Sequence, residues 1–322
     1  MSAARSNLAA TGRRRRLFIL LRALISIAAL GALLWWLEPA AMLDALGPLA
    51  PGWVLAGLAI SVPQVFVSAW RWRLTAHRLG LDLSLGRAFR EYYLATFLNQ
   101  VLPGGVGGDL SRAWRHASEA EDVRGAWHAV LIERVSGQVA LIVVAVVALL
   151  SSPVLLRGVT TFPAASKLQL VGVIAAFCAA VLWFSRRALT RLWRDLRHSM
   201  LARTVLPQQL LASFAVVASY IAVYFCSARA IGVPLPASSL LPLVPMVLLA
   251  MALPLSVAGW GLREGAAAGI WLLAGLAPAQ GVAISIAYGA LVFVSSLPGA
   301  ALLMLGGLGA EPRKDVARQD PQ

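Results

Sequence analysis

The sequence predicts an all-α polytopic membrane protein with six full spans and two re-entrant hairpins, about eight hydrophobic segments, arranged as an inverted repeat. Three observations support this prediction: the composition, the spacing of the long apolar runs, and a short motif that recurs at a fixed distance. Of the 322 residues, 59% are hydrophobic and 13% are charged, against roughly 25% charged in an average soluble chain. This composition excludes an ordinary soluble domain and a disordered chain, and the two cysteines are too few for a disulfide scaffold.

Six apolar runs are long enough to cross a bilayer core of about 30 Å, which takes roughly 20 residues of helix. They lie at residues 17–37, 53–70, 127–150, 168–184, 209–228 and 280–305. Arginines before an apolar run also describe an export signal, but the first run is longer than the roughly 7–15 residues of such a signal. We therefore expect an uncleaved first span.

Clusters of arginine orient these spans. They lie at residues 5–16, 71–90, 186–203 and 313–318, and positively charged loops remain in the cytoplasm. Both termini are therefore predicted to be cytoplasmic in a bacterial inner (plasma) membrane, with a basic N-terminus at 1–16 and a disordered tail at 307–322. The proline-interrupted stretches 89–112 and 240–264 must then enter and leave on one side, which predicts two re-entrant hairpins.

The two interrupted stretches share a motif. Leu-Pro-Gly-Gly-Val-Gly-Gly-Asp-Leu-Ser-Arg occupies 102–112, and Leu-Pro-Leu-Ser-Val-Ala-Gly-Trp-Gly-Leu-Arg occupies 253–263, so that five residue types coincide 151 positions apart. The same offset carries the first three spans onto the last three, which divides a domain at 17–306 into halves of about 17–155 and 168–306. Because each half has three spans, the second half is predicted to be inverted, a pattern typical of secondary transporters.

The first hairpin motif combines glycines with two charged residues. Gly104, Gly105, Gly107 and Gly108 would let an anion approach backbone N–H groups. Asp109 would then be the N-cap of a helix, and Arg112 would bind a phosphate or carboxylate. The alternative is a tight turn in which the glycines only reverse the chain and Asp109 only caps the helix.

The second hairpin offers Gly259, Gly261, Arg263 and Glu264. Adjacent residues on a helix point about 100° apart, so we expect that Arg263 and Glu264 do not need to pair, with one facing the site and the other the lipid interface. A purely structural role is equally open.

Glu133 and Arg134 lie inside the third predicted span, where charges usually face the bundle interior and pair. Glu133 would balance Arg112 or Arg71, or carry a proton. A structural ion pair near the interface is the alternative. We interpret the Arg71-Trp72-Arg73 sequence as an interfacial anchor at the end of the second span.

Other chemistries lack their signatures. The four histidines do not have metal-ligand spacing, and no phosphate-binding loop or dinucleotide fingerprint is present. We therefore expect no metal, no cofactor, no nucleic-acid partner and no ATP hydrolysis by this chain.

The motifs resemble one membrane-protein family. Arg71-Trp72, the run from Asn99 through Pro103 to Arg112, the Glu133-Arg134 pair and the stretch from Gly259 to Glu264 are similar to the lysylphosphatidylglycerol synthase transmembrane region, also called flippase-like or UPF0104 proteins. The resemblance implies lipid translocation, with these residues near the substrate and membrane lipids of anionic or phosphate head group as partners. The chain has no room for the synthase domain, so the resemblance implies no enzyme activity, and a separate lipid-modifying enzyme would be a partner.

The favoured hypothesis is ATP-independent flipping of a phosphate-bearing lipid or lipid-linked intermediate. Arg112 would hold the head group from inside and Arg263 from outside. An alternative is an integral-membrane transferase that uses Asp109, Glu133 and His128 as bases. Another is an accessory subunit of a lipid or cell-envelope synthesis pathway.

Overall fold

The computed structural model describes residues 49–102, 105–161, 205–251 and 259–308, together with residues 192, 195, 196 and 199. Within these ranges the regular structure is entirely helical. The predicted spans at 17–37 and 168–184, the N-terminus at 1–16 and nearly all of the tail at 307–322 lie outside the described residues.

Four described helices are long and apolar enough to cross a membrane. They are α3 (Pro51–Arg78), α6 (Val123–Ser151), α9 (Leu206–Ala230) and α13 (Pro278–Leu308). They correspond to the second, third, fifth and sixth predicted spans, so these four predictions are confirmed as apolar helices. The protein is therefore a multi-pass membrane protein.

Local sequence signals begin and end these helices. α3 and α9 both begin at a Leu or Pro with proline in the first turn, where the missing N–H costs nothing. Each is followed, two residues after its last residue, by a glycine of positive φ, Gly80 (77°) and Gly232 (76°). The N–H of the next residue returns to a carbonyl five positions earlier, Leu81 to Ala76 and Val233 to Ala228, which is the Schellman arrangement.

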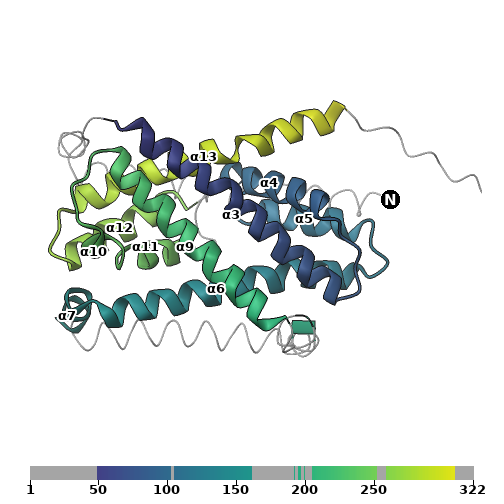
Figure 1. The fold of residues 1–322 in the computed structure, drawn as a ribbon, viewed down its shortest axis with the longest axis horizontal. Helices are drawn as coiled ribbons and strands as arrows, with labels where there is room; N and C mark the ends of the chain where they lie inside the picture. The colour runs from purple at the N-terminus through teal and green to yellow at the C-terminus, as the bar shows by residue number, and fades with distance from the viewer. Residues whose placement is uncertain are drawn as a thin grey trace, which may run out of the picture.

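α3 and α9 pack side by side in opposite directions. The Ala50 N–H at the start of α3 donates to the Ala230 carbonyl at the end of α9 over 2.8 Å. Near the other end, the Gln209 amide of α9 donates to the Thr75 hydroxyl of α3 over 3.0 Å. In Figure 1 these two helices cross the centre of the molecule, with α6 along one long edge and α13 along the other.

Short helices fill the two ends of the molecule. α4 (Leu85–Val101) and α5 (Gly107–Ala117) lie at one end, and α10 (Ala237–Leu240), α11 (Val244–Ala250) and α12 (Leu262–Leu273) lie at the other (Figure 1). α7 (Pro153–Thr161) follows α6. None of these six is as long as the roughly 20 residues that a span requires. The order of long helix, interrupted short helices and long helix occurs twice among the described elements.

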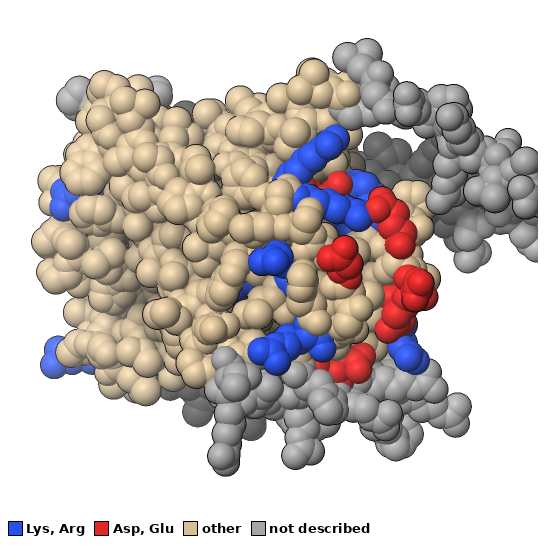
Figure 2. Space-filling model, turned by 45° about the vertical axis from the view of Figure 1, so that its right-hand side comes forward, with Lys and Arg blue, Asp and Glu red and all other residues tan. Residues whose placement is uncertain are grey.

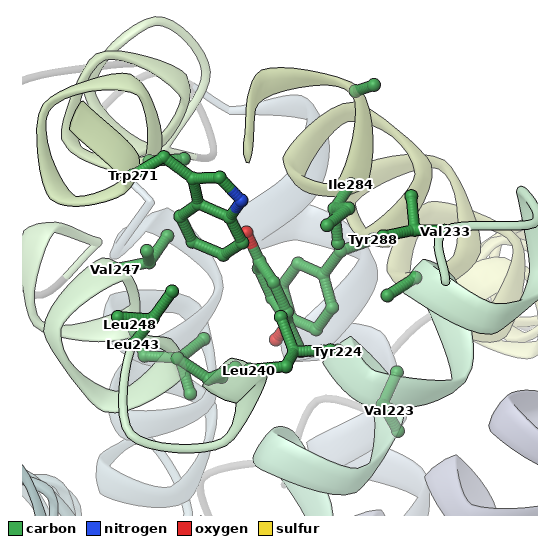
Figure 3. Packing of buried hydrophobic residues seen from close by; sticks show 14 of the residues in the cluster. Val223, Tyr224, Val233, Leu240, Leu243, Val247, Leu248, Trp271, Ile284 and Tyr288 are labelled. Atoms are coloured by element: carbon green, nitrogen blue, oxygen red, sulfur yellow. The ribbon is translucent and has the colours of Figure 1, made fainter. Parts of the chain in front are cut away.

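Each end has its own apolar core. At the end with α10–α12, Tyr224 and Tyr288 lie 5.1 Å apart between ring centroids, beside the fully buried Trp271 (Figure 3). At the end with α4 and α5, a second cluster is built largely of alanines around Trp72. Figure 2 shows a broad uncharged surface, with most of the charged side chains in view gathered on one side.

Candidate functional site

Five charged groups from three helices meet inside the first half of the protein. Arg71 comes from α3, Asp109 and Arg112 from α5, and Glu133 and Arg134 from α6. Four of them are less than a tenth exposed, whereas the Arg134 side chain is 36% exposed. Charges placed this deep in a membrane protein are costly unless they pair, and each of these five has a partner of opposite sign.

Arg112 pairs with two carboxylates and packs against two aromatic rings, while its buried Nη1 has no hydrogen-bond partner among the described residues. Its Nη2 lies 2.6 Å from Glu133 Oε2 and 2.9 Å from Asp109 Oδ1. Its guanidinium carbon lies 4.8 Å from the Trp72 ring centroid and 4.5 Å from that of Tyr92, within the range of a cation–π contact. Arg112 is fully buried and therefore joins α5 to α3, α4 and α6.

Arg71 joins α3 to α6. Its Nη2 donates to the Glu133 carbonyl and to the Ser136 hydroxyl, each over 2.7 Å, and lies 3.3 Å from Glu133 Oε1. The anchor interpretation of Arg71 was wrong, because α3 continues to Arg78 and places Arg71 inside the helix at 1% exposure. Hydropathy locates the end of an apolar run, whereas the helix end depends on backbone hydrogen bonds.

Arg134 is the accessible cation of the cluster. Its Nη1 donates to Asp109 Oδ2, and its Nη2 lies 3.4 Å from the Gly105 carbonyl in the turn between α4 and α5. Arg134 thus contacts the first hairpin with a side chain that is still about one-third exposed.

Asn99 organises the start of α5. Its Oδ1 accepts from the Gly108 N–H over 2.8 Å, and its Nδ2 donates to Asp109 Oδ2 over 3.0 Å. The prediction that Asp109 is the N-cap was wrong: α5 begins at Gly107 after an N-cap at Val106, and Asp109 is its third residue. The carboxylate of Asp109 therefore faces arginines, and Asn99 satisfies one free N–H of the first turn.

The glycines of the first motif have different roles. A Cβ on Gly108 would lie 1.9 Å from the Ala95 carbonyl oxygen, so this glycine lets α5 approach the backbone of α4. Gly105 has a φ of 60°, which favours glycine in the turn. Gly107 packs against the Leu102 side chain, while Pro103 and Gly104 lie outside the described residues.

The start of α12 contains a similar buried arginine. Arg263 Nη2 lies 2.5 Å from Glu264 Oε1, and its Nε donates to Ser285 Oγ over 2.8 Å. The expectation that Arg263 and Glu264 would diverge was wrong, because the long arginine side chain turns back to the neighbouring carboxylate. Glu264 also accepts from the Gly261 N–H over 2.7 Å and so caps α12.

Aromatic rings surround this arginine as they do Arg112. The guanidinium of Arg263 lies 5.0 Å from the Trp260 ring centroid and 5.4 Å from that of Tyr288. Gly261 and Gly259 have positive φ values of 84° and 85°. α5 and α12 are therefore each fastened by one buried arginine, at least one carboxylate and two aromatic rings.

A cavity of about 220 Å³ lies between the two halves. Of the predicted site residues, its lining includes Asn99, Gly105, Asp109, Glu133, Arg134 and Gly259. Gly107, Gly108, Arg112, Gly261, Arg263 and Glu264 do not belong to the described lining. Sequence reasoning missed Arg71 as a lining residue. It also missed Gln64, Tyr92 and Gln138, for which a polar residue within an apolar run was the available signal.

The charged lining residues of the cavity all come from the first half, whereas apolar lining residues come from both. All four charged lining residues belong to α3, α5 and α6. The described second half supplies no charged lining residue, and contributes apolar side chains such as Val216, Leu248 and Met251. The cavity therefore suits an amphiphile with an ionised end and an apolar end.

The described residues contain no group of three or more His, Cys, Asp or Glu side chains that could hold a metal ion. His128 lies outside the cavity lining, and its Nδ1 is 2.5 Å from Asp195 Oδ2.

Comparison with known proteins found a match to one family model and none to the curated proteins or to the solved structures. The model is described as the lysylphosphatidylglycerol synthase TM region and matches residues 19–299. That range includes both interrupted stretches, the five-residue charged cluster and every described lining residue of the cavity. The chain belongs to the lysylphosphatidylglycerol synthase TM region family.

Proposed function

We propose that this protein moves a lipid with a phosphate-bearing head group between the leaflets of a bacterial inner membrane, without ATP. The observation that carries the proposal is the cavity with a charged wall from one half and an uncharged wall from the other. A phosphate would contact the arginines, and the acyl or polyprenyl chain would follow the apolar wall. The family match supports a membrane-embedded function of this kind.

The arrangement of the helices supports an inverted repeat. α3 and α9 are equivalent in the element order and run antiparallel, as inversion requires. α4 with α5, and α11 with α12, are interrupted pairs too short to span, which suits re-entrant hairpins. In such folds the substrate site lies near the bilayer midplane, at the interface between the two repeats. The cavity is lined by residues of both halves and so occupies the corresponding position. Both termini would then face the cytoplasm.

Arg134 is proposed as the direct phosphate contact. It lines the cavity and is the most exposed member of the charged cluster. Arg71 lines the same wall, and its buried Nε has no hydrogen-bond partner among the described residues. Arg112 acts through Asp109 and Glu133, because its guanidinium is enclosed.

Alternating movement of the two hairpins would expose the cavity to each side in turn. The arginine clamps at Arg112 and Arg263 would keep each hairpin rigid during that movement. A head group that binds Arg134 would compete with Asp109, which is one of the contacts between α6 and the first hairpin, beside the Arg112–Glu133 ion pair. Binding would thereby favour release of that hairpin.

The transferase hypothesis has less support. Asp109 and Glu133 are both engaged by arginines, so neither carboxylate is free to approach a substrate proton. His128 is bound to Asp195 away from the cavity. No nucleophile lies beside a free base in the described lining.

The proposal is tested by leaflet exchange in proteoliposomes. The full chain is reconstituted with fluorescent phospholipids, and a membrane-impermeant reductant reports the fraction exposed outside. We expect exchange above that of protein-free vesicles, and a loss of about tenfold or more in Arg134→Gln, since a charged hydrogen bond is worth about 1.5–3 kcal/mol. Arg124→Gln is the matched control, because Arg124 lies on the same helix, is exposed and does not line the cavity.

Two results would contradict the proposal. One is an exchange rate no higher than that of empty vesicles with every phospholipid tested, in protein that remains monodisperse. The other is equal exchange in the Arg134→Gln and Arg124→Gln variants, which would remove Arg134 from the transport site.

A further inference from the structure

The cavity wall is rich in uncharged polar side chains. Besides three tyrosines, eight residues with an amide or an aliphatic hydroxyl belong to it: Ser61, Gln64, Ser68, Thr96, Asn99, Gln100, Gln138 and Ser295. Amides and hydroxyls both donate and accept hydrogen bonds, and a phosphate offers acceptors only. A bare phosphate would therefore use only part of this lining.

One of these side chains, Gln138, has a buried oxygen that lacks a hydrogen-bond partner in the described part of the chain. The Oε1 atom of Gln138 has no partner among the described residues, although it is closed off from solvent. Leaving a buried acceptor unpaired costs free energy, so the site favours a ligand that brings a donor. A head-group hydroxyl supplies one.

The net charge of the five-residue cluster limits which hydrogen-bond donor a bound head group can carry. Three arginines, Arg71, Arg112 and Arg134, face two carboxylates, Asp109 and Glu133, so one positive charge is in excess. One negative charge on the ligand would balance it. An ammonium group on the ligand would restore the excess and be repelled in a site of low dielectric.

We infer that the head group is a monoanionic phosphodiester that carries a neutral, hydroxyl-rich group, and that a cationic aminoacyl head group is excluded. The neutral group has the chemistry of glycerol or of a six-membered polyol ring. This inference rests on the proposed function and adds the substrate class. The phosphate contacts Arg134 and Arg71, and the hydroxyls contact Gln138 and Gln64.

Four lipids with the same fluorescent acyl chain separate the effect of the head-group hydroxyls from the effect of the head-group charge. Phosphatidylglycerol and phosphatidylinositol carry one negative charge and hydroxyls. Phosphatidylpropanol has the charge and the carbon skeleton of phosphatidylglycerol without its hydroxyls, and lysyl-phosphatidylglycerol adds positive charge. In vesicles of otherwise neutral phospholipid, at least one hydroxyl-bearing lipid is expected to exchange about tenfold faster than the last two, the effect of one or two hydrogen bonds.

Variants of the wall connect this selectivity to the cavity. Gln138→Leu is expected to slow the preferred hydroxyl-bearing lipid about tenfold and to leave phosphatidylpropanol unchanged, so that the preference disappears. Val139→Ala, at the next position of α6 and 53% exposed, is the matched control. Gln64→Leu on α3 repeats the test if Gln138→Leu does not fold.

The outcomes distinguish failure of the inferred substrate class from failure of the proposed function. A preference for the hydroxyl-bearing lipids that is lost in Gln138→Leu supports the inference, and the faster of the two indicates the size of the polyol. The inference is overturned, and the proposed function left standing, if neither phosphatidylglycerol nor phosphatidylinositol exchanges faster than phosphatidylpropanol, or if neither exchanges faster than lysyl-phosphatidylglycerol. Absence of exchange with all four lipids overturns both.

Discussion

Replacing Glu133 with glutamine tests how the charged cluster holds the fold. The carboxylate lies 2.6 Å from Arg112 Nη2, 3.3 Å from Arg71 Nη2 and 3.3 Å from the Tyr92 hydroxyl. Removing one partner of a buried ion pair costs about 3–5 kcal/mol, because the remaining charge stays buried. Arg112 retains Asp109, and Arg71 retains the Ser136 hydroxyl. We therefore expect the low end of that range, a loss of about 3 kcal/mol in the free energy of unfolding.

The control for Glu133→Gln is the same substitution in an exposed ion pair. Glu119 lies 2.6 Å from Arg87, and their side chains are 59% and 31% exposed. Solvent screens such pairs, which contribute about 0–1 kcal/mol. Both variants are unfolded reversibly in mixed micelles by titration with a denaturing detergent. Tryptophan fluorescence follows the transition, since Trp72 is buried against Arg112.

We expect the two variants to differ clearly in their free energy of unfolding. Glu133→Gln must be less stable than Glu119→Gln by about 2 kcal/mol or more. A difference below about 1 kcal/mol would refute the argument, because it would mean that the buried contacts of Glu133 stabilise no more than a surface pair.

Two further predictions concern the first hairpin. Gly108→Ala is expected to destabilise the protein by more than about 3 kcal/mol, because its Cβ would lie 1.9 Å from the Ala95 carbonyl oxygen, whereas Gly86→Ala has nothing within 4 Å. Equal yields of monodisperse protein in size-exclusion chromatography would contradict this. Asn99→Ala is expected to cost about 1–3 kcal/mol in the same detergent titration, because it leaves the Gly108 N–H and one oxygen of Asp109 without that partner. Unchanged stability would show that this cap does not hold α5.

Much of the architecture was predictable because its signals are local. The apolar runs at 53–70, 127–150, 209–228 and 280–305 each lie within or nearly within a described helix. The interruption before Asp109 was also visible, since glycine and proline break helices through their own backbone preferences. The apolar run at 53–70 is shorter than the helix that contains it, because α3 continues eight residues beyond the run to Arg78.

The sequence predicted which residues belong to the site better than it predicted how their side chains pair. Glu133 and Arg134 were identified because charges inside a span usually face the bundle interior, and Asp109 because it follows the glycine-rich motif; all three line the cavity. The pairing of Arg263 with Glu264 was missed, because helix geometry describes where a Cβ points and not how a long side chain turns back.

The sequence by itself determined the membrane class, four of the spans, the positions of the two interruptions and the charged residues placed within apolar segments. These features follow from hydrophobicity and backbone preference, which act between neighbours along the chain. Only the tertiary structure decided that Arg112 is enclosed by Trp72 and Tyr92 while Arg134 reaches the cavity. The physical reason is that burial and ion pairing depend on side chains distant in sequence, which meet only when the helices pack.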